Sequence, residues 1–163
     1  MSRTRIIGIG TPFGDDRAGL ELAGRLRAAP PRDSEVLATE RPGVELIDLL
    51  AGADAVLVLD AVRSGAPPGT IHDLALDDLP QPGVAVSSHG IGIADTLALA
   101  RALGGLPRGR FVGIEAGRGG PALGAELSVE VALALPAAVL RVHAWVDWYG
   151  DGERSGDGEA GRR

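Results

Sequence analysis

The chain has 163 residues, of which 45% are hydrophobic, so it is long enough for one domain with a sizeable core and too short for two ordinary domains. Its formal net charge of −6 argues against a nucleic-acid binder, because such proteins gather Lys and Arg on one face. Because cysteine is absent, the sequence excludes disulfides, thiolate metal sites and a catalytic thiol, and any metal would need His, Asp or Glu ligands.

The sequence predicts neither a targeting segment nor a membrane span. The chain enters an apolar run within a few residues of its start, which leaves no room for a signal peptide. No apolar run approaches the roughly 20 residues that a membrane-spanning helix needs. We therefore expect a cytoplasmic protein with no membrane and no nucleic-acid partner.

An apolar run at residues 5–9 predicts a buried strand at the start of the chain, and a glycine-rich turn follows it. Two acidic residues, Asp15 and Asp16, close this turn at the entrance of a helix that begins near Ala18 and ends before Pro30. A helix N-terminus favours negative charge, so the acidic residues are either helix caps or ligands. Asp15 is the better candidate for a cap.

The remaining segments alternate between apolar strands and amphipathic helices. Residues 53–59 form the most convincing strand, because their unalternating apolar run indicates burial on both faces of a parallel sheet, and Asp60 follows this strand directly. A long final helix begins behind Ser128, its expected N-cap, and should kink or lose a hydrogen bond at Pro136. Further strands are expected at 34–38, 70–74, 84–86 and 111–114, and further helices at 44–50 and 93–103.

This alternation predicts one α/β domain over residues 1–149 and a disordered tail over residues 150–163. The domain should be a three-layer αβα fold with a mostly parallel, twisted sheet of about five strands. The tail is composed largely of Gly, Asp, Glu, Ser and Arg and has no hydrophobic period. We assign no function to it.

Polar residues fall at the carboxyl ends of several predicted strands, where sheets of this type bind ligands. They are the pair Asp15 and Asp16, Asp60 after the central strand, and His89 just before a helix. Two carboxylates and an imidazole from three loops would form an open site for a first-row divalent metal. Each residue also has a structural interpretation: the acids as helix caps or a strand end, and His89 as a hydrogen-bonding residue in a turn. Glu115 also ends a predicted strand, and for it we expect a structural role.

The glycines of the first turn also suggest a dinucleotide site, but their spacing does not fit. The pattern Gly-x-Gly-x-x-x-Gly at residues 8–14 has one residue too many for the usual fingerprint, although Glu40 lies about where a ribose-binding acid would fall. A pyrophosphate at this helix N-terminus would meet the acidic pair, and like charges in a partly desolvated site repel by several kcal/mol. We therefore expect no organic cofactor.

Taken in order, these segments resemble the hydrogenase maturation endopeptidases. The resemblance extends over about residues 6–146, and the ordered set of motifs is more specific than any one of them. It rests on Gly8-Ile9-Gly10 with Asp16, Val58-Leu59-Asp60-Ala61-Val62 with Gly65 and Pro68-Gly69-Thr70-Ile71, Ser88-His89 with Gly92 and Asp95, Leu97-Ala98-Leu99-Ala100, Val112-Gly113-Ile114-Glu115, and Leu127-Ser128 with Ala134-Leu135-Pro136.

The resemblance implies a hydrolase that removes the C-terminal extension of the nickel–iron hydrogenase large-subunit precursor once nickel has been inserted. The metal-binding residues of the family fall here on Asp16, Asp60 and His89, the same three residues that the strand ends single out. In this interpretation they are both the metal ligands and the catalytic residues. The nickel is carried by the substrate, and the partner is the precursor itself.

Several positions depart from the pattern of the family. Thr11 stands where Asn is common, Gly90 follows His89 where an acid is frequent, and Arg17 replaces a small residue. Asp16 stands where relatives carry Glu, which shortens its reach by one methylene. The departures at Thr11 and Gly90 motivate an alternative function, a non-cleaving binding or chaperone-like module of the same fold that inspects a metalloprotein partner.

Overall fold

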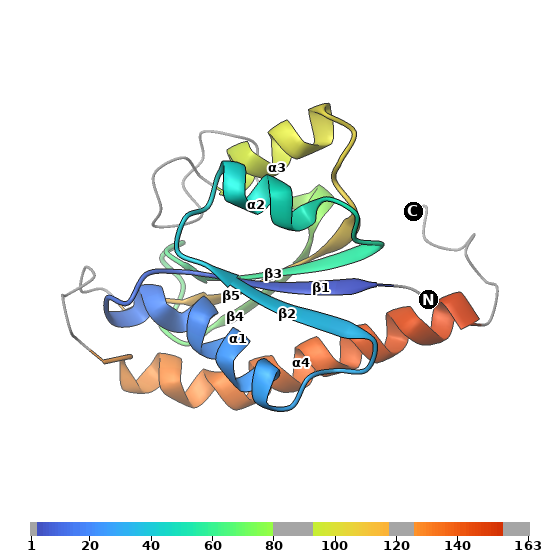
Figure 1. Ribbon diagram of the computed structural model, residues 1–163. Helices are drawn as coiled ribbons and strands as arrows, with labels where there is room; N and C mark the ends of the chain where they lie inside the picture. The colour runs from blue at the N-terminus through green and yellow to red at the C-terminus, as the bar shows by residue number, and fades with distance from the viewer. Residues whose placement is uncertain (1–2, 80–92, 118–125, 155–163) are drawn as a thin grey trace.

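The structure, a computed structural model, describes residues 3–79, 93–117 and 126–154 and shows a sheet between two layers of helices (Figure 1). The strand order is β2-β1-β3-β5-β4, and every neighbouring pair is parallel except β4 with β5. This confirms the predicted three-layer α/β fold with a mostly parallel sheet. The strands are β1 (Thr4–Ile9), β2 (Ser34–Thr39), β3 (Ala55–Val62), β4 (Ile71–Ala75) and β5 (Arg108–Glu115).

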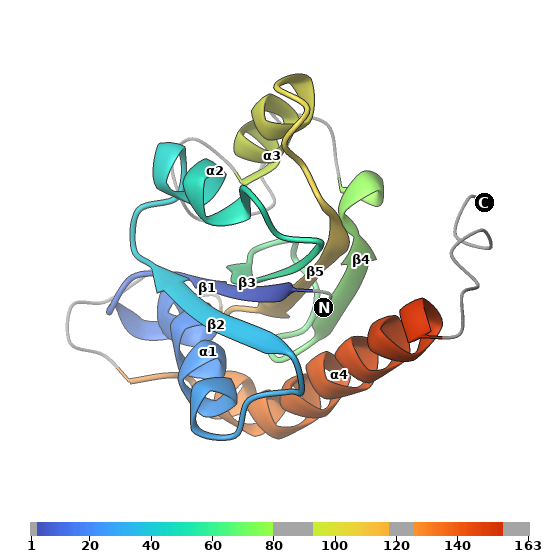
Figure 2. The same ribbon diagram turned by 45° about the vertical axis from the view of Figure 1, so that its right-hand side comes forward.

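Helices cover both faces of the sheet, with α1 and α4 on one side and α2 and α3 on the other (Figures 1 and 2). Each lies where an apolar stripe of helical period predicts it, and the predicted strand at residues 84–86 lies outside the described residues. The α-helices are α1 (Ala18–Ala28), α2 (Val44–Leu50), α3 (Ile93–Ala102) and α4 (Val129–Arg154), and short 3-10 helices form η1 (Gly14–Arg17) and η2 (Leu76–Asp78).

The core consists of one hydrophobic cluster on each side of β3, which is buried along its whole length. The residues of β3 alternate between the two faces of the sheet, because successive side chains of a strand point to opposite sides. Leu57 and Leu59 pack with residues of α1 and α4, whereas Val56 and Val58 pack with residues of α2 and α3. Burial on both faces explains why the run carries no polar alternation.

The central strand is longer than the sequence predicts. We expected β3 to end at Leu59 with Asp60 behind it, but the strand continues to Val62 and contains Asp60. The extension occurs because Ala61 and Val62 remain in register with the last residues of β5. A single acidic residue does not end a strand whose neighbour continues to pair with it.

The last helix, α4, is also longer than predicted. It runs through Pro136 and on to Arg154, so the first residues of the expected tail, 150–154, are helical, whereas residues 155–163 lie outside the described chain. Aromatic stacking and a cation–π contact stabilise this end of the helix. The ring of Tyr149 stacks on Trp145 at a centroid distance of 5.2 Å, and the guanidinium of Arg108 lies 4.4 Å from the Tyr149 ring centroid.

By length and composition, α4 is also the one helix in the described part of the chain that could cross a membrane, between Val129 and Gly152, with a mean hydropathy of 1.5. The sequence did not lead us to expect such a helix. One side of α4 nevertheless packs in the cluster that includes α1, although only 28% of this stretch is buried. Its buried residues are Val131, Leu135, Ala138, Val142 and Val146.

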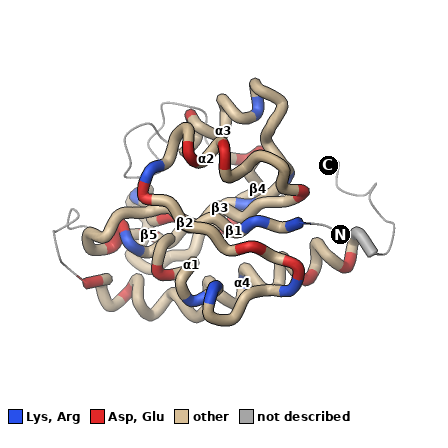
Figure 3. The backbone as a smooth tube through the Cα atoms, viewed as in Figure 1, with Lys and Arg blue, Asp and Glu red and all other residues tan. Residues whose placement is uncertain are grey.

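Basic residues are scattered along the chain among acidic ones (Figure 3). No face in this view is marked out by charge of one sign.

Candidate functional site

Two buried carboxylates lie at the edge of the sheet where the parallel strands end. Asp16 lies in η1, directly after the turn that follows β1, and Asp60 lies in the last part of β3. The residues are only 4% and 1% exposed, respectively. Because η1 packs against β3, the segments that carry them are in contact. Charged groups this deeply buried need a specific compensating partner, which makes their surroundings informative.

The glycines of the first turn serve close packing of backbone on backbone. A Cβ at Gly8 would lie 2.5 Å from both the Ala23 Cβ and the Gly19 carbonyl oxygen, and a Cβ at Gly10 would overlap the carbonyl oxygen of Asp16. Glycine at these positions therefore lets α1 and η1 close against β1. This packing explains why both positions are glycine, and it requires no phosphate ligand at the turn. The buried carboxylates of Asp15 and Asp16 would repel a phosphate group there.

Asp15 is an anchor rather than the helix cap that we expected. Neither η1 nor α1 has a side-chain cap hydrogen bond. Instead, Asp15 Oδ2 accepts the N–H of Gly117 at 2.8 Å and the hydroxyl of Ser128 at 2.9 Å, while Oδ1 accepts the N–H of Ser128 at 2.7 Å. Ser128 does precede α4 as predicted, but its hydroxyl serves Asp15. The carboxylate thus ties the first turn to the end of β5 and the start of α4.

Asp16 faces a cation that the sequence did not single out. Arg63 follows β3 directly, and its Nη2 lies 3.6 Å from Asp16 Oδ1. Its Nη1 donates to the carbonyl oxygen of Gly117 at 2.8 Å. The available signal was a basic residue three positions after Asp60, at the same sheet edge as the acidic pair, but we treated that segment only as a loop.

Asp60 lies on the sheet face that α2 and α3 cover. It is two residues from both Val58 and Val62 of that cluster, and residues two apart in a strand point to the same face. Its Oδ1 accepts the N–H of Ala61, its own neighbour, at 2.8 Å. Asp60 lies inside the strand, two residues before its last residue Val62, and not directly behind the strand as expected. It remains at the predicted carboxyl edge, beside the segment that carries Asp16.

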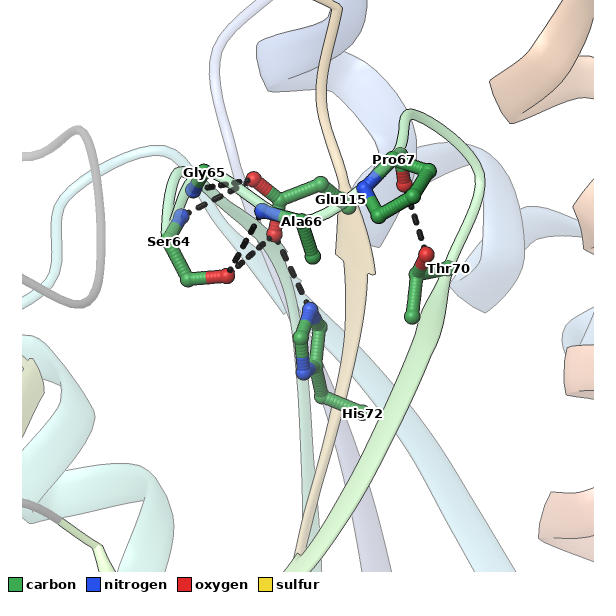
Figure 4. A network of polar contacts seen from close by, with 7 residues as sticks. All are labelled: Ser64, Gly65, Ala66, Pro67, Thr70, His72 and Glu115. Carbon is green, nitrogen blue, oxygen red and sulfur yellow. Dashed lines mark hydrogen bonds and ion pairs between the residues drawn. The ribbon is translucent and has the colours of Figure 1, made fainter.

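Glu115 organises the loop after β3, which confirms the structural role that we expected for it (Figure 4). Its Oε1 accepts the N–H groups of Ser64 and Gly65 at 2.9 and 3.0 Å. Its Oε2 accepts the Ser64 hydroxyl at 2.8 Å and lies 2.9 Å from His72 Nε2. Burial alone would raise the pKa of Glu115, but the bonds from Ser64, His72 and Gly65 together hold the pKa below its ordinary value.

The described residues contain part of the predicted metal site. Asp16 and Asp60 offer the carboxylate oxygens that the prediction requires, but His89 lies outside the described residues. Within residues 3–79, 93–117 and 126–154, no group of three or more His, Asp or Glu side chains is arranged to hold a metal ion. The meeting of Asp16, Asp60 and His89 around one ion therefore stays a prediction.

Comparisons with known proteins agree with one another. The HycI family model, described as hydrogenase maturation protease, matches residues 25–145. The hydrogenase expression/formation protein HupD of Rhodobacter capsulatus is 29% identical over 152 residues, which cover 88% of this chain and 72% of HupD. Among solved structures, the hydrogenase maturating endopeptidase HybD from E. coli gives a TM-score of 0.77 at 26% identity, covering 91% of this chain and 94% of that one. The NiFe hydrogenase maturation protease HybD from Thermococcus kodakarensis gives a TM-score of 0.65 at 26% identity, covering 88% and 98%.

Proposed function

Because this chain belongs to the hydrogenase maturation protease family, we propose that it removes the C-terminal extension of a nickel–iron hydrogenase large-subunit precursor after nickel insertion. Membership of the family supports a protease that acts in hydrogenase maturation with a hydrogenase subunit as its partner. The identity of that subunit, the timing after nickel insertion and the dependence on metal are parts of the proposal.

The observation that carries the proposal is the pair of nearly inaccessible carboxylates, Asp16 and Asp60, at the carboxyl edge of the sheet. We propose that these two side chains and His89 bind the nickel that the precursor carries. Carboxylate and imidazole are suitable ligands for a first-row divalent ion. Bound there, the ion would polarise the scissile carbonyl or lower the pKa of a water molecule.

Two further acidic residues, Asp15 and Glu115, hold the segments around this site in place. Asp15 fixes the turn that carries Asp16, because its carboxylate binds Gly117 and Ser128. Glu115 holds the loop that follows β3, because its carboxylate accepts the N–H groups of Ser64 and Gly65. This loop begins directly after the end of the strand that contains Asp60. His89 must be neutral at one nitrogen to act as a ligand, so nickel binding should weaken in acid.

The direct test is to incubate the protein with nickel-loaded large-subunit precursor and to measure the mass of the product. We expect wild type to release the C-terminal extension, and the Asp16→Asn, Asp60→Asn and His89→Ala variants to leave it attached. Asp48→Asn, which changes an exposed acid on α2, is the matched control and should cleave normally. Normal cleavage by any of the three site variants would remove that residue from the mechanism.

A second candidate function is a binding or chaperone-like module that inspects the precursor without cutting it. Thr11 favours this candidate, because its buried Oγ1 has no hydrogen-bond partner among the described residues, at a position where the resembling family commonly has Asn. The residue at this position of the first turn therefore differs from the one that the resemblance leads us to expect. The same mass measurement separates the two functions, because a binder forms a complex with the precursor and leaves the extension in place.

A further inference from the structure

We infer that Arg63 is a positioning residue that reserves the Asp16 carboxylate for metal delivered by the substrate and disfavours binding of free metal ions. This inference rests on the proposed role of Asp16 as a nickel ligand. Its structural basis is the ion pair between Arg63 and Asp16 together with the way in which Arg63 is itself held.

The Asp16 side chain is 5% exposed and that of Arg63 is 28% exposed, with 3.6 Å between Arg63 Nη2 and Asp16 Oδ1. A carboxylate in such a position is costly to keep ionised unless a positive charge stands beside it. The guanidinium supplies this charge, and Arg is protonated at every pH at which proteins fold. The Arg63 guanidinium therefore compensates the negative charge of the buried Asp16 carboxylate.

Arg63 has an anchor that is independent of Asp16. Its Nη1 donates to the Gly117 carbonyl oxygen at 2.8 Å, and the N–H of the same glycine donates to Asp15 Oδ2 at 2.8 Å. Gly117 thus connects the cation to the anchored part of the first turn. Because of this anchor, the guanidinium stays at the site even when Asp16 binds another cation.

The contact between Arg63 Nη2 and Asp16 Oδ1, at 3.6 Å, is an ion pair without the close approach of a hydrogen bond. By comparison, Arg110 Nε lies 2.6 Å from Asp73 Oδ1, at hydrogen-bonding distance. At these two atoms the link between Arg63 and Asp16 is therefore mainly one of charge.

The same positive charge disfavours a free ion. A divalent cation that enters alone meets the resident guanidinium at close range, where charges interact strongly because the surroundings are poor in water. Nickel that arrives inside the precursor brings ligands of its own, and contacts with the rest of the precursor contribute to binding. Arg63 would therefore bias the site toward loaded substrate over the free ion.

The test measures the affinity of the full chain for Ni²⁺ alone by calorimetry. We expect Arg63→Gln to bind Ni²⁺ at least about tenfold more tightly than wild type, because a repelling charge has been removed. Arg63→Lys keeps the charge but loses the planar fork that contacts Gly117 and Asp16 together, so we expect a smaller gain. Arg101→Gln, an exposed arginine paired with Asp77, is the control and should not change the affinity.

A double variant separates this role from a merely structural one. In Asp16→Asn/Arg63→Gln the gain in Ni²⁺ affinity should disappear, because it acts through the Asp16 carboxylate. An affinity of Arg63→Gln equal to or weaker than that of wild type overturns the inference, and so does a gain that persists in the double variant. If Arg63→Gln does not fold, as judged by circular dichroism, Arg63→Lys decides in the same way, with an unchanged affinity overturning the inference.

These results are distinguishable from failure of the proposed function. If Asp16→Asn alone cleaves nickel-loaded precursor at the normal rate, the proposed role of Asp16 in the reaction is wrong whatever the calorimetry shows. If Asp16→Asn abolishes cleavage but Arg63→Gln gains no affinity for Ni²⁺, only the inference about Arg63 is wrong.

Discussion

Two kinds of buried carboxylate lie at the carboxyl edge of the sheet, and they are held in different ways. Asp15 and Glu115 accept N–H and O–H groups from segments that are distant in the chain. Asp16 instead faces the Arg63 guanidinium at 3.6 Å, and Asp60 Oδ1 accepts the N–H of the next residue. The first pair thereby joins elements of the fold to one another through several hydrogen bonds each, whereas Asp16 contacts a side-chain cation; Asp16 and Asp60 also make further contacts besides these.

Under the proposed function, the two pairs have different roles, one in holding the fold and the other in binding the metal. A backbone N–H cannot be replaced by another donor unless the chain moves, so a carboxylate bound to several of them is committed to the fold. A guanidinium can be replaced by another cation without rebuilding the backbone. Asp15 and Glu115 therefore belong to the framework, whereas we propose that Asp16 and Asp60 bind the ion.

The largest expected effect is on cleavage, and it belongs to the second pair. Asp60→Asn keeps the shape of the side chain but removes its charge, so we expect cleavage of nickel-loaded precursor to fall by about 100-fold or more. The free energy of unfolding should change less than in the Asp15→Ala variant below, as measured by urea denaturation. If Asp60→Asn is more strongly destabilised than Asp15→Ala and still cleaves the precursor, Asp60 belongs to the framework and not to the metal site.

The next effect is on stability, and it belongs to Asp15. Asp15→Ala leaves the N–H groups of Gly117 and Ser128 and the Ser128 hydroxyl without their acceptor, so we expect a loss of about 2–4 kcal/mol in the free energy of unfolding. Urea denaturation measures it. Asp48→Ala, on the exposed face of α2, is the control and should stay within about 0.5 kcal/mol of wild type. Equal losses in the two variants would contradict an anchoring role.

A smaller effect, dependent on pH, is expected at Glu115. Its hydrogen bonds lower its pKa in the folded protein, so its charge stabilises the fold above the unfolded pKa of about 4.3, and this contribution is lost as pH falls through the folded value. We expect Glu115→Gln to cost about 1–3 kcal/mol at pH 7, with the difference from wild type shrinking in acid. Thermal unfolding between pH 3 and 7 measures this. A difference that does not vary with pH would show that the charge contributes nothing.

The smallest expected effect concerns the end of α4, away from both pairs. Arg108→Ala removes the cation from the Tyr149 ring and the hydrogen bond of Arg108 Nε to the Tyr149 hydroxyl at 3.2 Å. We expect a loss of about 0.5–1 kcal/mol in the free energy of unfolding and no change in cleavage. Arg101→Ala on α3 is the comparison variant. A drop in cleavage by Arg108→Ala would extend the site beyond the carboxyl edge of the sheet.

Local sequence signals predicted most of the fold. Val44–Leu50 was expected as a helix between glycines and is observed with those bounds, because Gly43 and Gly52 take positive φ values at its two ends. The end of β3 was missed because pairing with β5 outweighs the polarity of Asp60. The helical start of the expected tail was missed because the Tyr149 contact with Arg108 joins residues far apart in sequence.

The site could be predicted only in part, for a related reason. The positions of Asp16 and Asp60 at the carboxyl edge follow from where the predicted parallel strands end, which local patterns reveal. The acceptor role of Asp15 depends on partners 102 and 113 residues away, and no local pattern reports them. The Arg63 contact was missed in the same way, because it depends on how the loop after β3 folds back toward η1.

The Asp15 contacts also restrict the order in which the protein can assemble during synthesis. Asp15 leaves the ribosome early, but its partners Gly117 and Ser128 follow only after 102 and 113 further residues. Contacts that close such long loops form late in folding. The nascent chain therefore lacks the anchor of its first turn until the start of α4 has emerged. The segment that carries Asp15 and Asp16 is therefore fastened to the rest of the sheet edge only after Ser128 has been synthesised.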